Sequence, residues 1–251
     1  MALGGSGDRD RLRHGARRPA AHAAVVKAAA RGRGKKLVLA SASPRRHELM
    51  RAAGLRFDVV ASGIDERPPS RLGPLRYVRW AARAKAQAVA ATRPRDIVIG
   101  ADTEVVLDRR IFGKPRDRRE AQVFLRALSG RTHQVYTAIH VIAGRRNCTG
   151  ISRTHVTMRE LSTSAIAAYV RTGEAQDKAG AYAIQGKGRR LVRSIQGPYD
   201  NVVGMPMRLL SRLLTECGVP VTATSPDGLQ HEVTVHARHS PHRPRVGAAR
   251  R

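Results

Sequence analysis

The segment that decides the fold is KLVLASASPRR, residues 36–46. Its first half is a short apolar run, which predicts a buried strand over residues 36–40. Ser43 and Pro44 are favourable as N-cap and first helical residue, and Gly54 is a stop signal, so we expect a helix between them. The segment therefore predicts a strand, a tight turn and a helix in succession.

The rest of the central chain continues this alternation. Residues 96–101 are expected to form a third strand that is continuously apolar after Asp96, the pattern of a strand in a sheet that is covered on both faces. Pro74 opens a helix that we expect to run to residue 91. The remaining predicted elements are a strand at 57–61, a hairpin across 108–109, a helix capped by Asp117, strands at 132–143, 148–157 and 191–195, and helices at 163–170 and 205–217. This pattern predicts an α/β fold with a mixed sheet.

The composition is that of a strongly basic chain with enough apolar residues for a packed core. Its 251 residues include 47 Lys and Arg against 19 Asp and Glu, a formal net charge of +28. Such a charge favours an anionic partner, namely a nucleotide, a nucleic acid or a membrane surface. No segment is long and apolar enough to predict a transmembrane helix. Cys148 and Cys217 are far apart in the sequence and form no CxxC motif, so we expect neither a disulfide framework nor a zinc site, and a reducing compartment fits best.

Both ends of the chain differ from its middle. Residues 1–34 are rich in Arg and Ala, but Asp8 and Asp10 argue against a secretory signal. A transit peptide, a solvated extension and a start site placed too far upstream are the alternatives for this segment, and we expect a disordered basic extension. Residues 219–251 turn to Pro, His, Arg and Ser without helical or strand period, which predicts a disordered tail. A folded domain is left over residues 35–218.

Arg45 and Arg46 stand at the predicted turn between the first strand and its helix. Guanidinium groups beside the free N–H groups of a helix N-terminus are suited to holding a phosphate. Adjacent arginines in a basic chain are also common on a solvated face, which is the alternative. Ser41 and Ser43 lack His and Asp partners in the order of a hydrolase triad, so we assign them to capping and phosphate contact.

Two carboxylates and two lysines are further candidates. Asp102 follows an apolar strand and is expected at its end, where it either binds a metal, a cation or a proton, or caps a turn. Glu66 follows another strand and has the same alternatives. Mg²⁺ prefers a few carboxylates together with substrate phosphates, so this pair would suit it. Lys85 and Lys114 are either surface lysines or groups that neutralise a polyphosphate.

The two commonest nucleotide-binding motifs do not occur in this sequence. There is no G-x-x-x-x-G-K-S/T, and no G-x-G-x-x-G follows a strand, so a nucleotide site must be built differently. The basic stretch GKGRR at residues 186–190 is more typical of a turn. His133, His140 and His155 fall in predicted strands, and we treat them as ordinary strand residues rather than metal ligands.

Taken together, the singled-out segments resemble the Maf family of nucleoside triphosphate pyrophosphatases. The matching stretches occur in the family's order: ASASPRR at 40–46, GIDE at 63–66, AKA at 84–86, GADT at 100–103, GKP at 113–115, LSGRTHQV at 128–135, DKAGAYAIQG at 177–186 and NVVGMP at 201–206. Several blocks in order are far more specific than any one motif. The resemblance makes residues 35–218 a Maf-like pyrophosphatase domain and does not explain the two ends.

The resemblance implies a fold and an activity. The fold is a twisted mixed β-sheet flanked by helices, in two lobes with a central cleft, of the Maf/Ham1-like or inosine triphosphatase-like kind. The activity is hydrolysis between the α- and β-phosphates of dTTP and UTP, or of modified pyrimidine nucleotides, to the monophosphate and pyrophosphate. A divalent cation, Mg²⁺ or Mn²⁺, is implied as cofactor. The family further implies a homodimer and a cytoplasmic house-cleaning role in nucleotide metabolism.

The resemblance also carries residue roles by position. Asp102 would be the proton acceptor and a metal contact, and Glu66 would help to hold the metal. The phosphate chain would be bound or its charge stabilised by Lys85, Lys114, Ser41, Ser43, Arg45 and Arg46. The positions that match the specificity residues of the dTTP and UTP branch are Arg45, Thr103 and Gln185. A side-chain amide such as Gln185 can donate and accept at a pyrimidine edge.

Two other functions are alternatives to the pyrophosphatase. The net charge favours a nucleic-acid-binding protein, but one Trp, five Tyr and three Phe offer few platforms on which bases stack. Nucleic acid is therefore expected to bind only weakly, through the basic ends. A regulator of cell division is also associated with the family, but the full set of charged site residues favours an active enzyme.

Overall fold

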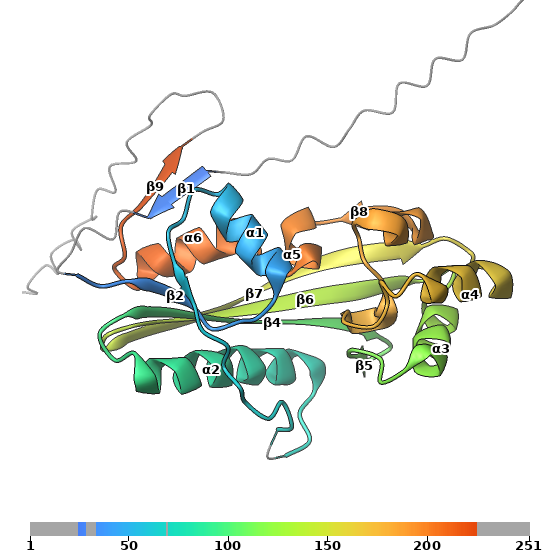
Figure 1. Ribbon diagram of the computed structural model, residues 1–251, viewed down its shortest axis with the longest axis horizontal. Coiled ribbons are helices and arrows are strands. Elements are labelled where there is room, and N and C mark those ends of the chain that lie inside the picture. Colours follow the sequence, from blue (N-terminus) through green and yellow to red (C-terminus); the bar gives the residue numbers. More distant parts are fainter. Residues whose placement is uncertain (1–24, 29–33, 69, 225–251) are drawn as a thin grey trace, which may run out of the picture.

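The computed structural model describes residues 25–28, 34–68 and 70–224 (Figure 1). A seven-stranded mixed sheet has the order β3-β2-β4-β6-β7-β8, with β5 paired to β4. β2 is parallel to both β3 and β4, and the other neighbours are antiparallel. The strands are β2 (Leu37–Leu39), β3 (Asp58–Val59), β4 (Ile97–Leu107), β5 (Arg110–Phe112), β6 (Thr132–Ala143), β7 (Arg146–Met158) and β8 (Val192–Gln196). The predicted α/β class with a mixed sheet is confirmed.

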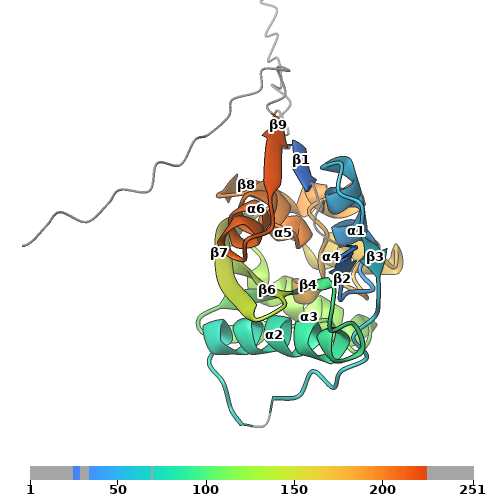
Figure 2. The ribbon, with the colours of Figure 1, turned by 90° about the vertical axis from the view of Figure 1, so that its left-hand side faces the viewer.

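Helices cover both faces of this sheet. The long helix α2 (Pro74–Thr92) lies along one face, and α1 (Pro44–Ala52), α5 (Tyr199–Val203) and α6 (Met207–Glu216) lie on the other (Figures 1 and 2). α3 (Arg118–Leu128) and α4 (Thr163–Arg171) pack at the far end, beside the short 3₁₀ helices η1 (Ala179–Ala181) and η2 (Gly186–Leu191). Asp117 caps α3 as predicted, because its carboxylate accepts a hydrogen bond from the backbone N–H of Glu120.

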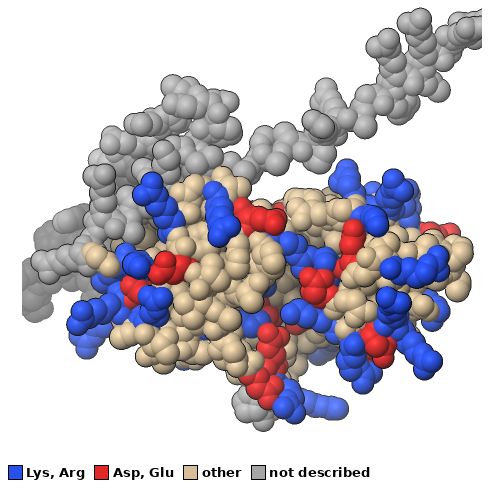
Figure 3. Space-filling view, in the orientation of Figure 1, with Lys and Arg blue, Asp and Glu red and all other residues tan. Residues whose placement is uncertain are grey.

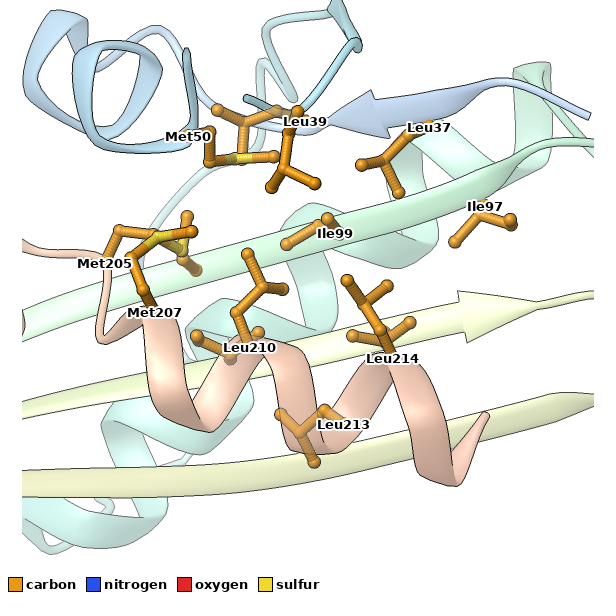
Figure 4. Close-up of a cluster of buried hydrophobic side chains, with 14 of the residues drawn as sticks. Leu37, Leu39, Met50, Ile97, Ile99, Met205, Met207, Leu210, Leu213 and Leu214 are labelled. Atoms are coloured by element: carbon orange, nitrogen blue, oxygen red, sulfur yellow. The ribbon is translucent and has the colours of Figure 1, made fainter. Parts of the chain in front are cut away.

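β2 shows how the sequence pattern places one strand between two layers. Leu37 and Leu39 point to the layer that contains α1 and α6, where Met50 and Leu210 are among their partners (Figure 4). Val38 points to the opposite layer, against α2. A strand that is apolar on both faces is what a parallel pair in the interior of a sheet requires. Each fully buried side chain of this size stabilises the fold by about 1.5–3 kcal/mol.

A second core lies at the other end of the same sheet. Val105 and Leu107 of β4 pack there with residues of α3 and α4, among them Leu125 and Ile166. β4, β6 and β7 contribute to both this core and the first one. The molecule therefore has two lobes that share long strands, as Figure 1 shows.

At Gly100 of β4 the backbone of α2 comes very close to the sheet. A Cβ built there would overlap the carbonyl oxygen of Ala82 and would lie 2.7 Å from the backbone nitrogen of Ala86. Glycine is therefore required for α2 to lie against β4 at this distance. The contact also fixes how near the side chains of α2 come to the next residues of β4.

Some predicted boundaries are wrong. Asp102 is not at a strand end: β4 continues to Leu107, and Asp102 pairs with Ala138 in the middle of the strand. The polar residues 102–104 looked like a terminus, but the strand becomes apolar again at Val105. The predicted strand 57–61 is reduced to two residues, Asp58–Val59.

Two short strands fall in ranges that the sequence analysis assigned to the disordered ends. β1 (Val25–Ala28) pairs antiparallel with β9 (Val221–Thr224). Three of the four residues of β9 are β-branched, a strand signal that was not used in the prediction. The other parts of the predicted extension and tail, residues 1–24, 29–33 and 225–251, lie outside the described residues.

The two cysteines, far apart in the sequence, are neighbours in space. The Sγ atoms of Cys148 on β7 and Cys217 at the end of α6 are 2.7 Å apart, and both are free thiols. Burial raises the pKa of the Cys217 thiol to about 12. In the described part of the chain, no helix has both the length and the hydropathy needed to cross a membrane.

Candidate active site

A cleft of about 740 Å³ lies between the two lobes. Its walls come from the turn between β2 and α1, the loop after β3, one face of α2, the middle of β4, the loop after β5, and the segment around η1. Nine of the ten predicted site residues line it: Ser41, Ser43, Arg45, Arg46, Glu66, Lys85, Asp102, Thr103 and Lys114. Gln185 is not in this lining; it is exposed, beside Tyr199.

The Arg46 side chain, from the turn between β2 and α1, is held in place by three hydrogen bonds. Its guanidinium donates to the carbonyl oxygen of Gly204 at 2.9 Å, to Oγ of Ser41 at 3.0 Å and to Oγ1 of Thr103 at 3.0 Å. Burial, opposed by the charge of Asp102, lowers the pKa of Arg46 below its ordinary value. Of the five guanidinium N–H groups, three are used in these bonds and two are left for a ligand.

Ser41 and Ser43 have different roles in this turn. Oγ of Ser41 accepts both from Arg46 and from the backbone N–H of Ser43, at 3.2 Å. Ser43 occupies the N-cap position of α1, as predicted, but its side chain makes no capping bond. Pro44, at the first helical position, has no N–H, and because Ser43 does not cap the helix, the backbone N–H groups of the next residues of α1 are available to an anion.

A chain of hydrogen bonds runs from Arg46 into the interior. Thr137 donates to the carbonyl oxygen of Asn201 at 2.8 Å, so Thr103 must donate to Thr137, 3.0 Å away, and accept from Arg46. Thr137 and Asn201 are fully buried. The amide of Asn201 in turn donates to the carbonyl oxygen of Val135 and to Oγ1 of Thr154, both at 3.0 Å. The site is thereby tied to β6, β7 and α5.

Lys85 bridges two carboxylates at the centre of the cleft. Its Nζ lies 2.7 Å from Oδ1 of Asp102 and 2.9 Å from Oε1 of Glu66. Lys85 and Asp102 are buried, whereas the Glu66 side chain is 47% exposed. Burial acts to raise the pKa of Glu66, but Lys85, Lys114 and Arg46 together outweigh it and the pKa is lowered. Glu66 reaches the cleft from a loop, several residues beyond β3.

Sequence analysis missed a third carboxylate, Glu104. It is two residues after Asp102, on the same face of β4, and is only 7% exposed. Its burial, together with the negative charges of Asp102 and Glu66, raises the pKa of Glu104 to about 8. A charged residue within a predicted strand usually marks the side that faces solvent. Only the two-residue spacing of Glu104 from Asp102 could have indicated that it belongs to a site.

Other charged and polar groups complete the lining. Arg45 is partly buried, and Lys114 is exposed in the loop after β5, so both have cationic groups near the anionic centre. The Asp177 carboxylate, 2.5 Å from Nζ of its neighbour Lys178, was not predicted as a site residue. Nor was Tyr77, which donates to the carbonyl oxygen of Glu66 at 3.1 Å.

The carboxylates of the cleft suit a divalent cation. Oδ2 of Asp102 and Oε2 of Glu104 are buried and have no hydrogen-bond partner among the described residues. Unpaired buried carboxylate oxygens are costly unless a cation or a proton compensates them. No group of three His, Cys, Asp or Glu within the described ranges forms a complete protein site. A hard cation held by one or two carboxylates, with substrate phosphates as its other ligands, fits this donor set.

Comparison with known proteins agrees with this geometry. The family model described as Maf-like protein matches residues 36–217. A dTTP/UTP pyrophosphatase of Myxococcus xanthus is 49% identical over 74% of this chain and 94% of its own length. Another of Moorella thermoacetica is 50% identical over 74% of this chain and 97% of its own length.

Among solved structures, a HAM1 protein from Coxiella burnetii has a TM-score of 0.40 and 15% identity, over 72% of this chain and 99% of that chain. A likeness this weak supports no conclusion. The family match covers the whole segment that carries the cleft, and the relatives are matched over nearly their full length. The chain therefore belongs to the Maf family.

Proposed function

We propose that this chain hydrolyses dTTP and UTP to the nucleoside monophosphate and pyrophosphate. The observation that carries the proposal is the juxtaposition of two features in one cleft: the Asp102–Lys85–Glu66 bridge and the turn that Arg46 holds in place. The names of the similar proteins support the choice of dTTP and UTP. The membership of the family supports the reaction class.

The phosphate chain would lie against the N-terminus of α1. The free backbone N–H groups there and the two remaining N–H groups of Arg46 are donors to phosphate oxygens. Arg45 and Lys114 add positive charge where the pyrophosphate leaves. Because Arg46 is fixed by three protein hydrogen bonds, it needs no reorganisation when the substrate binds.

Asp102 would accept the proton of the attacking water. Lys85 holds Oδ1, which leaves Oδ2 free to face the water. The water oxygen bonds to the α-phosphorus, the bond from that phosphorus to the bridging oxygen breaks, and its electron pair leaves with pyrophosphate. The proton of the water passes to Oδ2. Lys85 holds Asp102 in the orientation that this step requires.

A divalent cation, Mg²⁺ or Mn²⁺, would be held by Asp102 and by a second carboxylate, for which the sequence proposes Glu66. When bound, it would neutralise phosphate charge and polarise the α-phosphate. A carboxylate has about four lone-pair sites, so Asp102 can both contact a cation and receive a proton.

Selectivity, assembly and location are proposed from the family resemblance. Arg45 lines the cleft, and the hydroxyl of Thr103 is engaged by Arg46 and Thr137, so Thr103 would act by positioning Arg46. Gln185 is outside the lining, and its role as a reader of the base stays a prediction. The homodimer and the cytoplasmic location stay predictions as well.

Nucleic-acid binding is not favoured by any observation on the described residues. The basic ends to which it was assigned are largely outside them. On the face in Figure 3, Lys and Arg side chains are spread over both lobes and mixed with acidic ones, not gathered in one stripe. A groove that follows a nucleic-acid backbone would need such a stripe.

The experiment is a nucleotide panel with Mg²⁺ or Mn²⁺ in which pyrophosphate and orthophosphate are measured separately. dTTP and UTP should release pyrophosphate. The Asp102→Asn substitution should lower kcat by roughly a hundred- to ten-thousand-fold, because an amide cannot take the proton.

A matched control is Asp108→Asn, in the turn just after β4. Asp108 is exposed and has a φ of 49°, a conformation that Asn also tolerates. This variant should keep wild-type activity. Orthophosphate as the sole product, or full activity in the Asp102 variant, would refute the proposal.

A further inference from the structure

Glu104 is the most deeply buried carboxylate of the cleft after Asp102. Its exposure is 7%, against 4% for Asp102, and both line the cleft. Residues two apart on a strand project their side chains to the same side, so the two carboxylates face the cleft together. Each has one oxygen, Oδ2 of Asp102 and Oε2 of Glu104, that no described residue satisfies.

The two other acidic groups of the cleft do not share this property. Glu66 is paired with Lys85 at 2.9 Å, and nearly half of its side chain is exposed to solvent. Asp177 is paired with Lys178 at 2.5 Å, and 70% of its side chain is exposed. Both charges are therefore already compensated, by a lysine and by water. The buried carboxyl oxygens of the cleft that lack a hydrogen-bond partner among the described residues are therefore those on β4.

The near neighbourhood of Glu104 offers little protein compensation. Of the two buried cations of the cleft, Lys85 bonds to Asp102 and Glu66. The other, Arg46, donates to Gly204, Ser41 and Thr103. A Cβ added at Gly113 would lie 4.0 Å from Oε2 of Glu104, so this backbone borders the carboxylate without donating to it. Buried carboxyl oxygens in this arrangement need a proton or a cation from outside the chain, and one divalent cation can satisfy both carboxylates at once.

We propose that Glu104, together with Asp102, forms the carboxylate pair that holds the divalent cation, and that Glu66 instead positions Lys85. This rests on the proposed function, which requires such a cation. Two carboxylates on one strand leave the remaining coordination positions open to water and phosphate oxygens, as Mg²⁺ requires. The second metal ligand is then Glu104, on a strand of the sheet, and not Glu66, in an exposed loop.

The test measures Mn²⁺ binding in the absence of nucleotide, from the loss of the free Mn²⁺ signal in electron paramagnetic resonance. The variants are Glu104→Gln and the matched control Glu66→Gln, each a near-isosteric loss of one charge. Loss of a direct ligand should weaken Mn²⁺ affinity by at least about tenfold in E104Q, and by less than about threefold in E66Q. Wild-type affinity in E104Q would overturn the proposal.

Thermal unfolding gives a second readout that a merely structural role would not reproduce. Without metal, E104Q should unfold at a temperature equal to or above that of the wild type, because a buried carboxyl group that lacks a partner for Oε2 has been replaced by a group that cannot ionise. Added Mn²⁺ should raise the unfolding temperature of the wild type and of E66Q, and raise that of E104Q much less. An equal rise in all three proteins would overturn the proposal.

Two further results separate this inference from the proposed function. Pyrophosphate release by the wild type combined with normal Mn²⁺ affinity in E104Q would overturn only the assignment of Glu104. Absence of pyrophosphatase activity combined with weakened Mn²⁺ binding in E104Q would overturn only the function. If E104Q does not fold, Glu104→Asp keeps the charge on a shorter side chain: weakened Mn²⁺ affinity supports the proposal, and wild-type affinity overturns it.

Discussion

Replacing Gly100 by Ala tests whether the closeness of α2 and β4 controls catalysis. The new Cβ would overlap the carbonyl oxygen of Ala82 and lie 2.7 Å from the nitrogen of Ala86. These are backbone atoms that cannot rotate away. Ordinary van der Waals contact would require α2 to retreat by about 1 Å.

This displacement should affect both stability and activity. Overpacking of this kind costs about 2 kcal/mol, which lowers the melting temperature of a domain of this size by roughly 4–8 °C. Lys85 is on α2 and its Nζ is 2.7 Å from Asp102, so the same movement pulls the two apart. A misplacement of about 1 Å can reduce the rate about a hundredfold.

The assay compares Gly100→Ala with Gly73→Ala by thermal unfolding and by pyrophosphate release from dTTP. Gly73 is the N-cap of the same helix, with a φ of −68° and nothing within 4 Å of an added Cβ. It should therefore tolerate Ala without loss. A Gly100 variant with wild-type melting temperature and kcat would refute the reasoning, as would equal losses in both variants.

Two other predictions concern buried groups outside the cleft chemistry. His133 is 1% exposed, bonds to the hydroxyl of Tyr182 at 2.7 Å, and has its pKa lowered by burial to about 4. Because the folded protein holds His133 neutral, the unfolding free energy should fall as the pH drops from about 6.5 to 4, by up to about 1.4 kcal/mol per pH unit. Urea unfolding at pH 7 and pH 5 should show a smaller acid loss in His133→Asn, and equal losses would contradict this. The Sγ atoms of Cys148 and Cys217 are 2.7 Å apart, so treatment with a small-molecule disulfide should form a disulfide bond between them while the reagent is reduced. Mass spectrometry should then show that the protein has lost two hydrogens. In Cys148→Ser the Cys217 thiol should still react with maleimide after the same treatment and denaturation. A wild-type protein in which both thiols still react with maleimide after the treatment would contradict the prediction.

The parts of the fold that could be predicted are those with local signals. The strand before Ser41, the turn with Pro44 and the helix that follows are encoded within a few residues, and all three are present. The hairpin between β4 and β5 was also predicted, and its two turn residues have positive φ. The middle of β4 was misjudged because polar side chains that face a cleft interrupt the apolar run in the same way as a strand end.

The contacts that assemble the cleft could not be predicted from local pattern. Arg46 donates hydrogen bonds to Thr103 and Gly204, which are 57 and 158 residues away in the sequence. No local sequence pattern indicates contacts between residues so far apart. The bridge from Lys85 depends on how deeply α2 sits against the sheet. Glu104 was not predicted because what distinguishes it is the burial of its carboxylate, which the sequence does not show.

The long strands shared by the two lobes decide how the cleft can move. Because β4, β6 and β7 pass through both cores without a break, the described part of the chain has no linker about which one lobe could rotate as a rigid body. Access for a nucleotide must then come from the loops at the rim and from gentle twisting of the sheet. Small-angle scattering should accordingly record nearly the same radius of gyration with and without a bound nucleotide, unlike enzymes that close on a hinge.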